Sequence, residues 1–125
     1  MNENTEPTEK TIRDTQLESL RLLILGSKTD SSKDDLLNLA LDGAEVVGLN
    51  ILFPFNMNIQ ELDVSNKRIC NWQVRCAKEL YSAIQRDGIK RYAENNLDIE
   101  YLESQLSSKI LFELVPKAGV PKSDN

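Results

Sequence analysis

The sequence predicts a mainly α-helical fold, and three observations support this prediction. The chain has 125 residues, of which 40% are hydrophobic, enough for one modest core. Apolar residues recur at helical spacing through two long stretches, whereas strand-like alternation is confined to one short segment. A glycine or a proline follows each helical stretch and predicts its end. We expect a small helical bundle with two long helices, a short N-terminal helix, a small extended hairpin or loop, and a short C-terminal helix.

The domain boundaries follow from composition. Residues 1–14 are polar with little to bury, so we expect a flexible arm there, and we expect the same of the tail, residues 116–125. Residues 15–115 then form a single helical domain. Its first helix is expected to begin at Thr15, which has a glutamate three residues later, and to end at Gly26.

The second predicted helix begins near Ser31 or Ser32 and ends at Pro54. One apolar stripe on it is expected to face the core, and a second stripe lies about 120° away around the helix. The core stripe consists of Leu36, Ala40, Ala44, Val47 and Ile51, and the second consists of Leu39, Val46 and Phe53. The second stripe is either further core or a subunit interface. Gly43 and Gly48 predict the close approach of a neighbouring helix.

The third predicted helix is capped by Asp63 or Ser65 and is stopped by Gly88. Its apolar face is broad and includes Trp72, which we expect to anchor the core. The basic residues on the opposite side are Lys67, Arg68, Arg75, Lys78 and Arg86. We interpret these side chains as solvated or as forming salt bridges between subunits, and the alternatives are proximity to DNA without reading its sequence and sequence-specific DNA binding.

The chain after the third helix changes character. Three apolar residues alternate with polar ones as they would in a strand, namely Leu97, Ile99 and Tyr101. A turn at Asn95 and Asn96 would join two extended arms. We therefore expect residues 88–101 to project from the bundle as a small hairpin or loop. The residues expected to make its contacts are Gly88, Lys90, Arg91, Glu94, Asn95 and Asn96.

The residue types that most catalytic and metal sites need are scarce. The chain has no histidine, the commonest general base and a frequent zinc ligand. Cys70 and Cys76 point in different directions on the third helix and are expected to be buried free thiols. Asp42 and Glu45 are interpreted as a solvated pair, and the scattered glycines form no phosphate-binding loop. We therefore expect neither an enzyme nor a cofactor.

The formal net charge of −5 is unevenly distributed. Acidic residues dominate residues 29–63 and 94–113, whereas basic residues dominate residues 64–93. Overall acidity argues against a free-standing nucleic-acid binder. Alternating acidic and basic segments are suited to docking against copies of the chain or against other proteins. Solvated helix faces would give the same charge pattern. The short apolar runs and polar start predict neither a membrane span nor a targeting peptide, so we expect a cytoplasmic protein.

Three segments stand out by their order along the chain: DDLLNLALDGAEVVGLNILFPF (34–55), CAKELYSAIQRDGIKRY (76–92) and LSSKILFELVP (106–116). This order resembles the head–tail connector proteins of long-tailed bacteriophages and related prophages, also called adaptor or head-completion proteins. With the helix between the segments, the resemblance covers residues 15–116. Family members often have a Ser/Gly-rich loop where residues 89–96 of this chain are basic and contain asparagine.

The resemblance implies a structural virion protein. Such proteins form a ring of about twelve copies below the portal protein, extend the DNA channel, and join the capsid to the stopper (head-closure) or tail protein. DNA in the channel lies nearby and is not bound specifically. The implied location is the neck of the virion, and the host cytoplasm during assembly.

The resemblance also implies which residues make contacts. The second stripe and the five basic residues of the third helix would form the subunit interface, and residues 88–101 would touch the next subunit or the stopper. The residues implied to dock on the portal are Leu111, Leu114, Val115, Pro116 and Lys117. The alternative function is a small cytoplasmic helical adaptor or regulatory protein that binds one partner protein.

Overall fold

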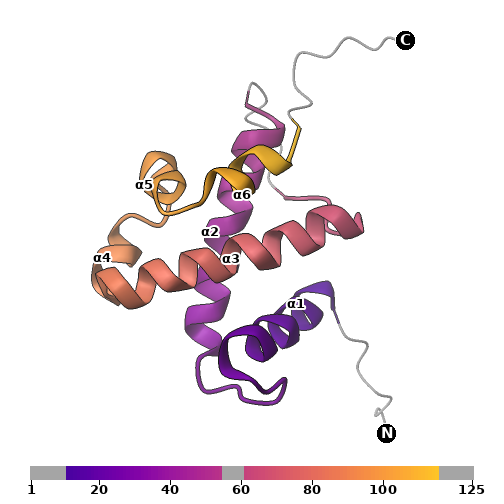
Figure 1. Cartoon of the computed structure of the whole chain (residues 1–125), viewed down its shortest axis with the longest axis vertical. Coiled ribbons are helices and arrows are strands. Elements are labelled where there is room, and N and C mark those ends of the chain that lie inside the picture. The colour runs from indigo at the N-terminus through magenta and orange to yellow at the C-terminus, as the bar shows by residue number, and fades with distance from the viewer. Residues whose placement is uncertain (1–10, 55–60, 116–125) are drawn as a thin grey trace, which may run out of the picture.

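The computed structural model describes residues 11–54 and 61–115, and this part of the chain is a bundle of helices without strands (Figure 1). The mainly α-helical prediction is confirmed. In chain order the elements are α1 (Ile12–Leu20), the π-helical turn η1 (Arg21–Leu25), α2 (Asp34–Leu52), α3 (Lys67–Asp87), α4 (Ile89–Glu94), α5 (Ile99–Ser104) and α6 (Ser108–Glu113). The predicted tail and most of the predicted arm lie outside the described residues.

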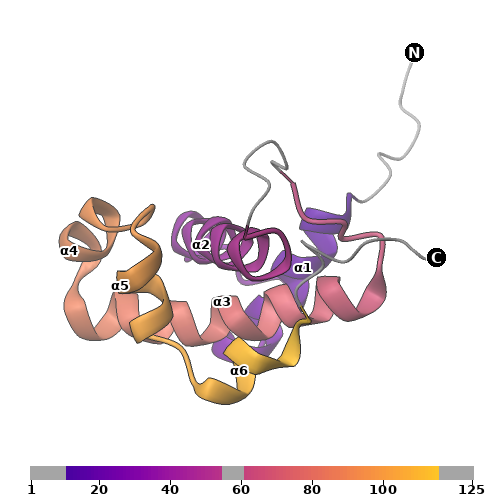
Figure 2. The same ribbon diagram turned by 90° about the horizontal axis from the view of Figure 1, so that it is seen from above.

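The two long helices, α2 and α3, cross and pack against each other (Figure 1). α1 lies against both of them, and α6 packs on a different side of α3 (Figure 2). α4 follows the end of α3, and α5 returns to pack against α2. The short helices therefore cover the crossed α2–α3 pair.

Trp72 belongs to the core, as predicted. Its side chain is fully buried, and its indole Nε1 donates a hydrogen bond to the Ile110 carbonyl at 2.9 Å, which joins α6 to α3. A Cβ atom on Gly48 would lie 2.9 Å from Cζ3 of Trp72. A Cβ atom on Gly43 would lie 2.5 Å from the hydroxyl oxygen of Tyr92. Both glycines therefore permit the close approach that the sequence predicts.

The buried face of α2 is rotated slightly from the predicted core stripe. Ala40, Ala44 and Val47 are buried as predicted, whereas Leu36 and Ile51 are half-buried. The leucines that are buried instead are Leu37, Leu41 and Leu52. The reason is that α2 contacts α1 and α5 as well as α3, so its buried arc is wider than one stripe.

A pair of buried glutamines joins α1, α2 and α3. Gln16 Nε2 donates to Gln73 Oε1 at 2.8 Å, and Gln73 Nε2 donates to the Leu41 carbonyl at 3.0 Å. Both glutamines are only 2% exposed. A slipped α1 would leave these amides buried without partners, so the pair fixes how α1 sits on the two long helices.

The first helix begins earlier than predicted. Thr11 caps α1 in a reciprocal capping box with Asp14, so Thr15 lies inside the helix and the predicted arm is helical from Ile12. Thr11 and Thr15 are both threonines followed three residues later by an acidic residue, so the sequence pattern fits a cap at either position. The predicted end at Gly26 is confirmed, where φ is 78°.

The predicted caps of the two long helices are wrong. Asn66 caps α3 by accepting two backbone N–H groups at 2.9 and 3.3 Å. The side chains of Asp63 and Ser65 bond to each other instead. Ser32 likewise donates to Asp30 at 2.6 Å, and α2 begins without a side-chain cap. Short polar side chains close together in sequence compete for the same role, and the pattern alone does not rank them.

The predicted hairpin within residues 88–101 is also wrong, because this segment forms α4 and α5 and contains no strand. Gly88 ends α3 as predicted, with φ of 91°, and the chain enters α4 directly. Asp98 caps α5 by accepting a backbone N–H group at 3.1 Å. Helical spacing then places Leu102 in the core and leaves Leu97 in solvent, so the alternation does not reflect a strand.

Candidate interaction surfaces

The second stripe of α2 packs against the chain's own core. Leu39, Val46 and Phe53 are all half-buried, and all contact buried residues of the bundle. These contacts agree with the first of the two alternatives, in which the second stripe is part of the core. Each side chain also keeps a solvent-facing part, so a subunit interface at the stripe stays a prediction.

Two of the five basic residues on α3 are engaged within the chain. Arg75 donates two hydrogen bonds of 2.6 Å to the Glu113 carboxylate, a bidentate pair that fastens α6 to α3. These bonds raise the pKa of Arg75 and lower the pKa of Glu113. Arg86 donates to the side chain of Gln105 and lies 3.5 Å from a carboxylate oxygen of Asp87. The basic residues of this face without an ion-pair partner in the described ranges are Lys67, Arg68 and Lys78.

The end of α6 exposes apolar side chains. In the predicted portal-docking group, Leu111 and Leu114 are half-buried against the core, whereas Val115 is 72% exposed. Phe112 was not predicted to make a contact, yet it is 81% exposed. Helical geometry explains this, because Ile110 faces the core and a residue two positions later points away from it. Two members of the predicted group lie outside the described residues: Pro116 and Lys117.

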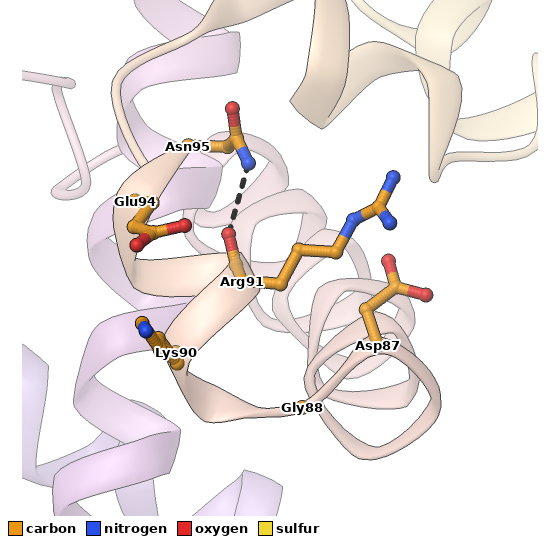
Figure 3. Close-up of a pocket in the computed structure, with 6 residues that line it drawn as sticks. All are labelled: Asp87, Gly88, Lys90, Arg91, Glu94 and Asn95. Carbon is orange, nitrogen blue, oxygen red and sulfur yellow. Dashed lines mark hydrogen bonds between the residues drawn. The ribbon is translucent and has the colours of Figure 1, made fainter.

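Five of the six predicted loop residues line an open hollow of about 590 Å³ at the end of α3 (Figure 3). The lining residues are Asp87, Gly88, Lys90, Arg91, Glu94 and Asn95. Asn95 Nδ2 donates to the Arg91 carbonyl at 2.9 Å, and the Arg91 side chain extends toward the side of the hollow that holds Asp87 (Figure 3). The sixth residue, Asn96, is half-buried in the following turn. The hollow is therefore a polar surface of mixed charge.

Asp87 links this hollow to α5. Its carboxylate accepts a hydrogen bond of 2.8 Å from the Tyr101 hydroxyl. Partial burial and this bond raise the pKa of Tyr101. This bond therefore ties Asp87, which lines the hollow, to the first turn of α5.

The described residues contain no group of three side chains that could hold a metal ion. Asp42 pairs with Arg13 at 3.1 Å, and Glu45 accepts a backbone N–H group at 3.2 Å, so the two predicted neighbours have separate partners. Both cysteines are free thiols, as expected, but only Cys76 is buried, which raises its pKa, while Cys70 is half-buried. No helix in the described ranges is long and apolar enough to span a membrane.

Comparisons of the chain with protein-family models, with curated proteins and with solved structures find no match. The surfaces described above, together with the resemblance in the order of the helices, are therefore the basis for assigning a function.

Proposed function

We propose that the chain is a structural connector of a long-tailed phage particle. It would form a ring below the portal, extend the DNA channel, and join the capsid to the stopper or tail protein. The observation that supports this proposal most directly is the apolar end of α6, where Phe112 is 81% and Val115 is 72% exposed. Large apolar side chains in water are unfavourable and mark interaction surfaces when they cluster. In the connector family that the chain resembles, the C-terminal segment packs against the portal.

A cavity of mixed lining adjoins the docking surface. Its volume is about 150 Å³, and it is lined by Leu52, Ile69, Leu114 and Val115 together with the polar residues Asn66, Arg68 and Glu113. A partner side chain could fill this cavity while Phe112 is covered. The Arg75–Glu113 pair and the Trp72 hydrogen bond hold α6 against α3, so the surface exists on the folded chain before any partner binds.

The test measures binding to portal rings of the phage or prophage that encodes the chain, by co-sedimentation. Phe112→Ser should weaken binding roughly tenfold or more, the effect typical of an aromatic anchor at an interface. Its unfolding temperature should stay unchanged, because the side chain is exposed. Ile12→Ser is the matched control, since Ile12 is an apolar residue on α1 that is also exposed, at 40%.

Equal binding by the two variants would contradict docking through α6. Complexes with one copy per partner and no ring would favour the alternative function, an adaptor that binds a single partner protein.

A further inference from the structure

A groove lies between η1 and α3, and Arg75 of the basic face forms part of its lining. Its volume is about 480 Å³, and Leu22, Leu23 and Val74 supply its apolar lining. Leu22 is 48% exposed and Leu23 is 52% exposed. Two adjacent leucines with half of their surface in water indicate a site that another apolar group can cover.

A complementary apolar side chain projects from the connection between α4 and α5. Leu97 is 75% exposed in this connection. The backbone N–H of Asp98 donates to the Asn95 carbonyl at 3.0 Å, and the Asp98 side chain caps α5. Leu97 is therefore presented by a hydrogen-bonded turn, so little further ordering is needed when it inserts into a groove.

The surroundings of the groove and of Leu97 carry opposite unpaired charges. Two cations line the groove: Arg75, which is paired with Glu113, and Lys28, which has no ion-pair partner among the described residues. Near Leu97 in the chain stand three acidic residues that form no ion pair in the same ranges: Glu94, Asp98 and Glu100. A contact between the two regions would bring these opposite charges together and would favour correct pairing over other encounters.

The two regions cannot meet within one chain. Both views place the α4–α5 connection and the end of α1 that leads into η1 on different sides of α3 (Figures 1 and 2). The occupant of the groove must therefore come from another molecule, and the charge match points to a second copy of this chain.

We propose that Leu97 of one copy fills the Leu22–Leu23 groove of the next copy. Because the two surfaces differ, the contact is head-to-tail, and its repetition closes into a ring when the rotation between copies allows. The proposal deepens the connector function and rests on the self-association which that function requires. It names a contact distinct from the second stripe of α2.

Cross-linking of mixed variants tests the contact directly on the full chain. Leu97→Cys and Leu23→Cys proteins, one of them labelled with nitrogen-15, are mixed and treated with a short bifunctional thiol reagent. Mass spectrometry should find the mixed pair at least tenfold above two controls. One control is wild type, whose thiols are half-buried or buried, and the other pairs Leu97→Cys with a cysteine at exposed Ser82 on α3.

A second measurement tests the direction of the contact. Leu97→Asp removes the inserted side chain, and Leu23→Asp removes the groove, both at exposed positions that should leave the fold intact. Each variant alone should sediment as a monomer. In a mixture, Leu97 of the Leu23→Asp protein can still enter the intact groove of the Leu97→Asp protein. Only this one contact can form, so assembly should stop at a heterodimer.

Two results would overturn the proposal: cross-linking of the mixed pair no stronger than the controls, or Leu97→Cys chains that link preferentially to each other. The connector function fails separately, at the portal. Portal binding by chains that do not cross-link this way would leave the connector function standing and remove this contact. Cross-linking without portal binding would support this contact and contradict the connector function.

Discussion

Two tyrosines with different surroundings illustrate what single side chains contribute. The Tyr92 hydroxyl is buried and has no hydrogen-bond partner among the described residues, whereas the Tyr101 hydroxyl donates to Asp87. Tyr92→Phe should therefore raise the free energy of unfolding by about 1 kcal/mol, because it removes an unpaired polar group from the core. Tyr101→Phe should lower it by about 1 kcal/mol, because it removes a bond. Urea denaturation of both variants measures the difference, and a loss of stability in Tyr92→Phe equal to that in Tyr101→Phe would contradict this account.

The Arg75–Glu113 pair predicts a dependence of stability on pH. The hydrogen bonds from Arg75 lower the pKa of Glu113 in the folded chain below its ordinary value of 4.5. A carboxyl group whose pKa is lowered by folding stabilises the fold above the unfolded pKa, and the contribution is lost as pH falls through the folded pKa. The loss should be at most about 1 kcal/mol, since the pair is partly exposed.

Glu113→Gln tests this dependence through urea denaturation at several pH values. The variant should lose less stability than wild type when the pH falls below about 4.5, the ordinary value for the group. Glu100→Gln is the control, since Glu100 is exposed and forms no ion pair in the described ranges. Parallel curves for wild type and Glu113→Gln would show that the pair contributes nothing.

At the scale of helices, Val46→Asp distinguishes the two interpretations of the second stripe of α2. Val46 is half-buried and packs against the core, so a charge there should lower the free energy of unfolding by about 2 kcal/mol or more. Val115→Asp is the matched control, because Val115 is 72% exposed and its substitution should change stability by less than about 0.5 kcal/mol. If Val46→Asp melts like wild type and only assembly is lost, the stripe is a subunit interface and its core role is wrong.

The helical elements could be predicted because their signals are local. Gly26 and Gly88 end helices where a positive φ is needed, and the long apolar repeats of α2 and α3 exceed what strands produce. The prediction of a hairpin was wrong because three alternating apolar residues are too few to define a period. Asp98, an acidic cap three residues before Tyr101, was the available signal for α5.

The contact surfaces could be predicted only in part. The resemblance implied a contact at Val115, which is exposed and whose docking stays a prediction, and the helical spacing of α6 could have identified Phe112 as outward-facing. The bidentate Arg75–Glu113 pair and the Gln16–Gln73 bond join residues far apart in the chain. Such pairs depend on how helices pack, and no local pattern contains that information.

At the scale of the whole molecule, the surfaces are distributed in a way that suits assembly. The helix α6, the connection between α4 and α5, and the end of α1 that leads into η1 lie around the α2–α3 pair (Figures 1 and 2). The exposed side chains of α6, Leu97 and the groove beside η1 belong to these different elements. One copy could therefore contact a portal and two neighbours without using the same residues twice. This separation of surfaces is the central feature of the proposed connector function.

Electron cryo-microscopy of portal rings incubated with the chain tests the central claim most directly. The account predicts a continuous ring of chain copies attached to the portal, with cyclic symmetry and with α6 facing the portal surface. The same incubation with Phe112→Ser should leave the portal bare. Portal rings without added density, or with isolated copies that do not touch one another, would contradict the account.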